Sequence, residues 1–310
     1  MLVRPNRSFP GTLFMIKGSA IQMVWKNIVL LVVVATVLTL QYEAWDLDRF
    51  SLTLIPFQLV GLALSIFLGF RNNACYDRWW EARKLWGALV NTSRDLARQV
   101  LAHVDAPGDQ AEIEAWQRDA LYRIIAFVYA LKAHLRQHPV LDEVAPFLPA
   151  AEVERLRGTK NVPYAIVVGF SERLTEIRRR GWVHPYHVGL LDESVTKLID
   201  ILGACERIKK TPVPLSYTVL THRLVAAYCF ALPFGIVHDV GPLTPVVVGF
   251  VGFAFLGLDS VGTQLEDPFE EDPNDLPLAA LSRTIEIDVR QLLGDRDLPE
   301  PVQPVGGVLL

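Results

Sequence analysis

Acidic side chains gather in one short stretch late in the chain, between residues 259 and 275. These carboxylates are Asp259, Glu266, Asp267, Glu270, Glu271, Asp272 and Asp275, and no lysine or arginine interrupts them. Clustered carboxylate oxygens are hard ligands that suit Ca²⁺, although the spacing and turn glycine of an EF-hand are missing. The candidate ligands are Asp267, Glu271, Asp272 and Asp275. The alternative is a solvated acidic loop that docks against arginine-rich helices.

Other reactive side chains are sparse. His184 and His187 are three residues apart and could share a metal on one helical face, but no third ligand is near in sequence, so solvated histidines are the alternative. Three scattered cysteines give neither a disulfide framework nor a zinc spacing. Phosphate-binding loops, nucleophile elbows, zinc-protease helices and dinucleotide fingerprints are absent from the sequence. The sequence therefore predicts no enzyme and no required cofactor.

The composition indicates that apolar residues are concentrated in segments. Of the 310 residues 51% are hydrophobic and 21% charged, which excludes a disordered protein, and the net charge of −4 argues against a nucleic-acid partner. Four apolar segments stand out: 28–40, 52–70, 224–237 and 241–258. A helix needs roughly 20 apolar residues to cross a bilayer. The segments predict two transmembrane hairpins, with buried helices of a soluble protein as the alternative.

The charges beside these segments predict their orientation. Basic residues precede the first and third segments and follow the second: Arg4, Arg7, Lys17, Arg71, Arg78, Arg83, Lys84, Arg207, Lys209, Lys210 and Arg223. The linker between the first two segments is mainly acidic, with Glu43, Asp46 and Asp48. By the positive-inside rule both termini and residues 71–223 are cytoplasmic. We expect a multi-pass protein of the inner or plasma membrane, without a signal peptide.

The remaining sequence reads as helix. Helical patterns cover 79–104, 113–138, 163–180 and 188–208, and an amphipathic helix is expected over 278–293, before a proline-rich tail. The fold class is therefore all-α. We expect residues 1–70 to hold an N-terminal segment and the first hairpin, 71–223 a cytosolic helical region, and 224–258 the second hairpin. Residues 259–310 hold the acidic loop, the last helix and the tail.

Two rows of side chains mark the second apolar segment. Leu62, Ile66 and Phe70 recur at every fourth position and share one helix face, and the small residues Gly61, Ser65 and Gly69 form a neighbouring row. A ring of identical helices could pack through the small row and point the bulky row at its axis. Such a ring makes a narrow apolar constriction that gates by dewetting. The alternative is that both rows pack inside a monomeric bundle.

Residues 67–83, FLGFRNNACYDRWWEAR, resemble the signature of bestrophins in its bacterial form, and two further segments agree with it. These are ACERI through TPVP over 204–214 and LEDPF through NDLPL over 265–278. The resemblance implies a homopentameric ion channel with four membrane spans per subunit and a large cytosolic region. It places the apolar neck of the axial pore on Leu62, Ile66 and Phe70. It places a second, cytosolic constriction on Tyr186, where the family usually has an aliphatic residue.

The resemblance also bears on calcium and on the permeant ion. In animal bestrophins the segment that matches the acidic stretch is a calcium clasp, and Asp272 and Asp275 stand at its acidic positions. Asp267 and Glu270 replace the clasp's asparagine and glycine. Animal members conduct chloride and bacterial relatives favour monovalent cations. We expect a passive sodium or potassium channel, with a chloride channel or a non-conducting membrane scaffold or calcium sensor as alternatives.

Overall fold

The computed structural model describes residues 1, 16, 18–45, 53–105 and 110–309. The N-terminal basic residues Arg4, Arg7 and Lys17 and the linker acids Asp46 and Asp48 lie outside these ranges. The chain divides into two compact units. We call Leu2–Trp79 with Pro212–Pro268 the apolar unit, and Met1, Trp80–Thr211 and Phe269–Leu310 the polar unit.

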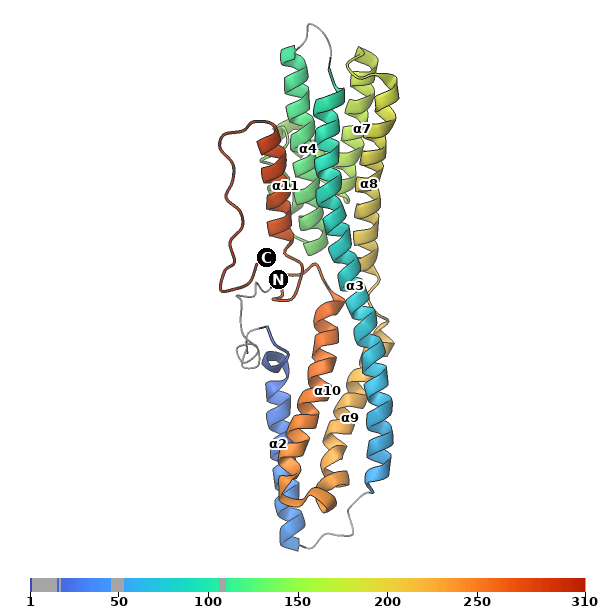
Figure 1. Ribbon diagram of the computed structural model, residues 1–310, viewed down its shortest axis with the longest axis vertical. Coiled ribbons are helices and arrows are strands. Elements are labelled where there is room, and N and C mark those ends of the chain that lie inside the picture. The colour runs from blue at the N-terminus through green and yellow to red at the C-terminus, as the bar shows by residue number, and fades with distance from the viewer. Residues whose placement is uncertain (2–15, 17, 46–52, 106–109, 310) are drawn as a thin grey trace. The chain divides into compact units, whose positions relative to one another are not determined.

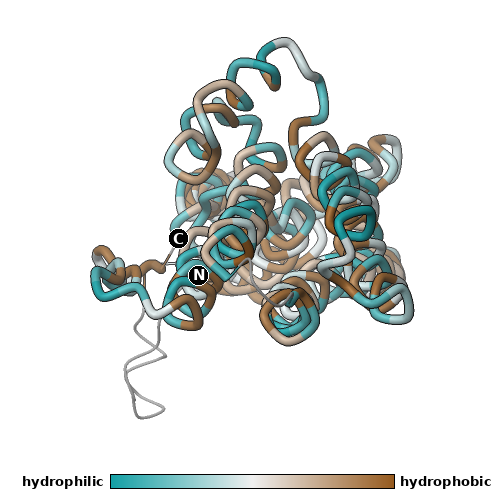
Figure 2. The backbone as a smooth tube through the Cα atoms, turned by 90° about the horizontal axis from the view of Figure 1, so that it is seen from above, coloured by the Kyte–Doolittle hydropathy of each residue, from teal (hydrophilic) through white to brown (hydrophobic). Residues whose placement is uncertain are grey.

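The described residues are almost entirely helical, which confirms the all-α prediction (Figure 1). The helices are α2 (Ile21–Trp45), α3 (Leu54–His103), α4 (Gln110–Arg136), α5 (Val140–Val144), α6 (Ala150–Leu156), α7 (Val162–Arg180), α8 (Pro185–Lys210), α9 (Leu215–Val240), the short 3₁₀ turn η2 (Gly241–Leu243), α10 (Thr244–Glu266) and α11 (Leu278–Leu292). In the described ranges β-pairing is limited to two isolated bridges. Figure 2 shows apolar and polar positions alternating around the helical turns.

Helix α3 joins two parts of the sequence pattern. The apolar segment 52–70 and the helical pattern over 79–104, between which no break was predicted, form one continuous helix of 50 residues. Residues 71–78 contain neither proline nor glycine, so nothing local ends the helix there. At Arg71 the side chains change from apolar to charged, while the backbone remains helical.

The apolar unit consists of α2, the first half of α3, α9 and α10. Its core includes Leu31 of α2, Leu64 and Leu68 of α3, Val225 of α9 and Val248 of α10, each at most 3% exposed. Gly252 of α10 lies against Leu31, where an added Cβ would come within 3.0 Å of a methyl group. Close contact through small residues is how helices associate in lipid. Three helical stretches of the described chain are long and apolar enough to cross a membrane: Ile21–Ala44, Leu54–His103 and Leu215–Glu266.

The polar unit is built around α4, which is buried along most of its length by α5, α7, α8 and α11. Local signals set the ends of its neighbours. The side chain of Asn161 caps α7 by accepting a hydrogen bond from the Tyr164 amide at 3.1 Å, and Gly181 ends α7 with a φ of 75°. The short helices α5 and α6 had no counterpart in the sequence analysis, because five and seven residues carry too few turns for a periodic pattern.

Candidate functional site

The bulky row of the second apolar segment lies on the exposed face of α3. Leu62, Ile66 and Phe70 are 63%, 51% and 65% exposed. Gly61, Leu64 and Leu68 form the buried face of the same helix, which a turn of 3.6 residues places on roughly the opposite side. Half or more of each bulky residue is therefore uncovered by the described part of this chain and is available to a second copy, to lipid or to a shared axis.

The small residues of the neighbouring row have different surroundings. Gly61 is buried against Tyr228 of α9, and an added Cβ would come within 2.6 Å of the tyrosine hydroxyl. Gly61 therefore serves a contact inside the chain. Ser65 is exposed and donates a hydrogen bond to the Gly61 carbonyl at 2.8 Å. A Cβ at Gly69 would meet none of the described atoms within 4 Å, so Ser65 and Gly69 leave this surface open to a neighbouring copy.

Two residues of the bestrophin-like signature, Arg71 and Asn72, tie α3 to α10. Arg71 is 1% exposed, and its guanidinium contacts the Asp259 carboxylate at 2.5 Å and the Thr263 hydroxyl at 3.0 Å. Asn72 donates to the Leu258 carbonyl at 2.9 Å, and an added Cβ at Gly262 would come within 2.4 Å of the Asn72 side chain. These contacts fix the rotation of α3 about its own axis, and that rotation keeps the bulky row on the outside.

Beyond Phe70 the exposed face of α3 carries polar residues as well as the exposed aromatic residues Tyr76 and Trp80. Asn73 lies seven residues after Ile66, and Asp77 lies seven residues after Phe70, so each is two turns further along nearly the same line. Both are exposed. The sequence analysis did not single out Asp77, although its seven-residue spacing from Phe70 is readable from the sequence.

The acidic stretch is divided between the two units. Asp267 belongs to the apolar unit, whereas Glu271, Asp272 and Asp275 belong to the polar unit. No three histidine, cysteine or acidic side chains of the described residues come together as a metal site. Calcium binding stays a prediction that the structure does not test.

Arg136 of α4 holds the part of this stretch that lies in the polar unit. Its guanidinium donates to the carbonyls of Phe269 and Glu270 at 3.1 and 3.3 Å and to the Glu271 carboxylate at 3.2 Å. This resembles the docked acidic loop that the sequence analysis kept as an alternative. Arg136 itself was not foreseen, because a buried arginine inside an amphipathic pattern gives no separate signal.

Asp275 is 2% exposed, and its carboxylate accepts a hydrogen bond from the Asp272 amide at 2.7 Å. Burial raises the pKa of Asp275 to about 7, and the nearby carboxylates of Asp272 and Glu270 act in the same direction. This side chain is therefore partly protonated near neutral pH, which makes it a poor calcium ligand in this conformation.

Tyr186, the predicted cytosolic constriction, is 80% exposed at the start of α8. His184 precedes it as the N-cap, and its ring nitrogen accepts from the Tyr186 amide at 3.3 Å. The His187 ring lies 4.2 Å from that of His103 between centroids, which with His184 still gives no three-residue metal group in the described chain. The Tyr186 ring meets the His187 ring edge-on at 6.3 Å between centroids and is otherwise largely exposed.

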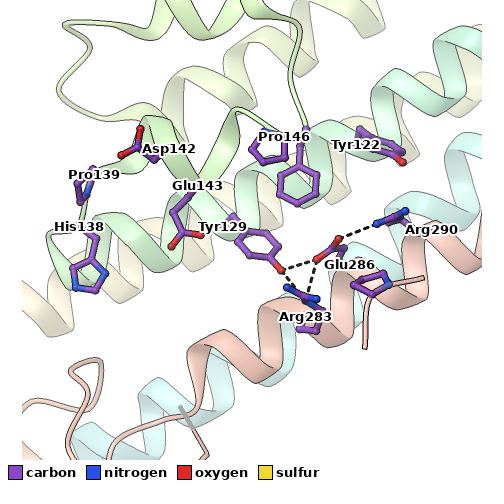
Figure 3. Close-up of a pocket in the computed structure, with 12 residues that line it drawn as sticks. Tyr122, Tyr129, His138, Pro139, Asp142, Glu143, Pro146, Arg283, Glu286 and Arg290 are labelled. Atoms are coloured by element: carbon purple, nitrogen blue, oxygen red, sulfur yellow. Dashed lines mark hydrogen bonds and ion pairs between the residues drawn. The ribbon is translucent and has the colours of Figure 1, made fainter. Parts of the chain in front are cut away.

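A pocket of about 660 Å³ opens in the polar unit beside α4 and α11 (Figure 3). The Tyr129 hydroxyl donates to the Glu286 carboxylate at 2.6 Å, and Arg283 and Arg290 each contact Glu286 at 3.2 Å. Burial raises the pKa of Tyr129, so its hydroxyl remains a donor. These polar groups satisfy one another and hold α11 on α4, which is a structural role.

The three cysteines are also structural. Cys75, Cys205 and Cys229 are free thiols and are at most 1% exposed. Burial raises the pKa of Cys205 in α8 to about 12, so its thiol stays protonated and unreactive. Cys205 lies in the second bestrophin-like segment, in which Glu206 accepts hydrogen bonds from His134 and Asn161 at 2.8 Å. This segment thus ties α8 to α4 and to the cap of α7.

Comparison with known proteins agrees with this arrangement. The family described as Bacterial/Fungal Bestrophin protein matches residues 1–291. A voltage-dependent anion channel-forming protein of Ralstonia nicotianae is 36% identical over 298 residues, which cover 96% of each chain. One of Mesorhizobium japonicum is 37% identical over 295 residues, covering 95% of this chain and 93% of the relative.

Solved structures give the same answer. The crystal structure of a bacterial bestrophin homolog from Klebsiella pneumoniae is 33% identical and has a TM-score of 0.82. The match covers 88% of this chain and 100% of that one. The resemblance of the three sequence segments is thereby confirmed over nearly the whole chain, and the chain belongs to the bestrophin family.

Proposed function

We propose that this protein is an ion channel in which identical copies surround one axis. The observation that carries the proposal is the row of Leu62, Ile66 and Phe70, which is exposed on a helix whose opposite face is fixed by Arg71 and Asn72. A single apolar unit cannot enclose a pore with an outward row. A ring of copies turns the same row into a neck that excludes water until it widens.

The proposal includes the predictions on assembly, membrane topology, the second constriction and calcium. The assembly is a homopentamer, and α2, the first half of α3, α9 and α10 are its four spans per subunit. The first hairpin lies within residues 1–70 and the second within 224–258, with 71–223 and both termini on the cytoplasmic side. Tyr186 forms the second constriction. Calcium is a candidate regulator through residues 259–275 and is not required for conduction.

Monovalent cations are our first candidate for the permeant ion, as the overall negative charge and the acidic outer linker suggest. Anions are the second candidate, because the relatives from Ralstonia and Mesorhizobium are named as anion channel-forming proteins. The apolar neck carries no charge, so it does not decide between them.

The test is the reversal potential of purified protein in planar bilayers under a sodium chloride gradient. A potential near the sodium equilibrium value supports a cation channel, and one near the chloride value supports the second candidate. Absence of conductance from confirmed oligomers, in the wild type and in Ile66→Ala, would contradict the channel and favour the scaffold alternative.

Ile66→Ala tests the neck itself. Removing three carbons from each copy widens and wets the constriction, so conductance should rise several-fold at unchanged oligomeric state. Leu30→Ala on α2 is the matched control, because Leu30 is 50% exposed, Ile66 is 51% exposed, and the two substitutions remove the same number of carbons. Equal conductance of the two variants would contradict the assignment of the neck to this row.

A further inference from the structure

We propose that Asp77 is the residue that gives the pore its preference for cations. This inference rests on the proposed channel function, because Asp77 acts only where copies of α3 surround an axis. It concerns a different property, however, since a channel with an inert Asp77 would still conduct.

The part of α3 that belongs to the apolar unit carries only three charged residues, Arg71, Asp77 and Arg78. The two arginines are directed to α10. Arg71 is buried against Asp259 and Thr263, and Arg78 donates from Nε to the Glu266 carbonyl at 3.3 Å. Both positive charges of this segment are thus committed to contacts within the chain.

Asp77 is the remaining charge. It is exposed, and its side chain forms no hydrogen bond or ion pair with another residue in the part of the chain that the structure describes. It follows Phe70 by seven residues, which is two helical turns or about 10 Å along the helix. Asp77 therefore lies two turns closer than Phe70 to the C-terminal end of α3. It is on the same exposed face as the row that the proposed function directs to the axis. Asn73 lies between them on that face.

A ring of identical copies repeats this carboxylate around the axis at the mouth of an apolar constriction. Low-dielectric walls focus the field of such a ring, and charged clefts raise the local concentration of the opposite ion by roughly tenfold or more. Sodium and potassium ions are then concentrated at the neck and chloride is depleted. Arg71 is paired with the Asp259 carboxylate, and Arg78 is hydrogen-bonded to the Glu266 carbonyl, both away from the exposed row, so Asp77 is the charge of this segment that lies on the face of the neck.

The experiment compares reversal potentials of the wild type, Asp77→Asn and Asp77→Glu in planar bilayers under a sodium chloride gradient. We expect a cation preference in the wild type that falls by roughly tenfold in Asp77→Asn, whereas Asp77→Glu retains it because the charge is kept. Glu114→Gln removes an exposed carboxylate from α4, which belongs to the polar unit, and should leave the preference unchanged.

Ionic strength gives a second readout. The Debye length shrinks from about 10 Å at 0.1 M salt to about 3 Å at 1 M. The difference between the wild type and Asp77→Asn should therefore decrease as the salt concentration rises. A difference that is independent of salt would contradict a field effect and with it the proposed role of Asp77.

The outcomes separate the two proposals. Conductance with equal selectivity in the wild type and Asp77→Asn, or a wild type that prefers chloride, overturns the role of Asp77 and leaves the channel intact. If the wild type does not conduct, the Asp77 variants are measured in combination with Ile66→Ala. Absence of conductance from Ile66→Ala in confirmed oligomers overturns the proposed channel function, and with it the inference about Asp77.

Discussion

Arg71 in the apolar unit and Arg136 in the polar unit are both nearly buried, at 1% and 7% exposure, but they are neutralised in different ways. Arg71 faces the carboxylate of Asp259, which is itself largely buried. Arg136 donates mainly to backbone carbonyls, and the side chain of its acidic partner Glu271 is 50% exposed. The first arginine belongs to a buried charge pair, whereas the second organises a loop.

This difference predicts unequal costs of removing each arginine. A buried pair that loses one member leaves a charge without its main partner, whereas a carbonyl that loses a donor leaves only a neutral acceptor unsatisfied. The comparison also indicates what each contact is for. Arg71 sets the rotation of α3 and therefore the direction of its exposed row, and Arg136 sets the path of residues 269–275.

The largest effect is expected for Arg71→Met. Asp259 would lose its main partner and keep only His222, whose ring nitrogen lies 3.3 Å from the carboxylate, at a cost of up to about 3–5 kcal/mol. We expect a lower midpoint of thermal unfolding in detergent and a smaller oligomeric fraction by native mass measurement. The double variant Arg71→Met with Asp259→Leu should recover much of the loss, because it removes the stranded charge.

The control for both arginines is Arg98→Met, since the side chain of Arg98 is 60% exposed in its pair with Asp95. This variant should change stability by no more than about 0.5 kcal/mol. A loss for Arg71→Met as small as that of the control would show that the Arg71–Asp259 pair contributes little.

An intermediate effect is expected for Arg136→Met. Loss of its hydrogen bonds to Phe269 and Glu270 should cost about 1–3 kcal/mol, with the damage confined to the loop. Hydrogen exchange of the amides in residues 269–275 should accelerate, while that of α4 changes little. Uniform acceleration across the polar unit would instead make Arg136 a core residue and remove the contrast with Arg71.

The effect expected for Asp275→Asn differs from both, because it depends on pH. Burial raises the pKa of Asp275 from 3.8 to about 7, so between these values the folded state binds more protons than the unfolded state. Stability of the wild type therefore falls as pH rises from about 4 to about 7, by at most about 4 kcal/mol from this group, since each pKa unit corresponds to about 1.4 kcal/mol.

The variant lacks this contribution and should unfold at a higher temperature than the wild type at pH 8 but not at pH 4. The side-chain oxygen of the introduced asparagine can still accept the hydrogen bond from the Asp272 amide. Asp192→Asn is the control, because Asp192 is an exposed carboxylate on α8. Parallel pH profiles for the wild type and Asp275→Asn would contradict a raised pKa at this site.

Much of the helical organisation could be predicted from the sequence, because apolar periodicity directly reflects which face a helix buries. The segments predicted at 163–180 and 278–293 appear as α7, Val162–Arg180, and α11, Leu278–Leu292. The short helices α5 and α6 were not predicted, because they carry too few turns for a periodic pattern. The burial of Arg71 was not predicted either, because its partner Asp259 lies in α10.

The candidate site shows the same limit. The spacing of Leu62, Ile66 and Phe70 was visible in the sequence, but their exposure depends on Arg71 and Asn72, whose partners lie in α10, more than 180 residues away in the chain. Arg136 was missed for a similar reason, since its acceptors are carbonyls, which no side-chain pattern can reveal. Distant contacts of single buried polar residues are the part that required the structure.

The burial of Cys75, Cys205 and Cys229 has a practical consequence for labelling chemistry. A thiol-specific reagent meets little competition from the native cysteines of the folded protein, because they are at most 1% exposed. Substitutions such as Asp77→Cys or Tyr186→Cys would then introduce the accessible thiol, without first removing the native ones. The reaction rate of that thiol, measured position by position along α3 in the assembled protein, would report which side of the helix is in contact with water.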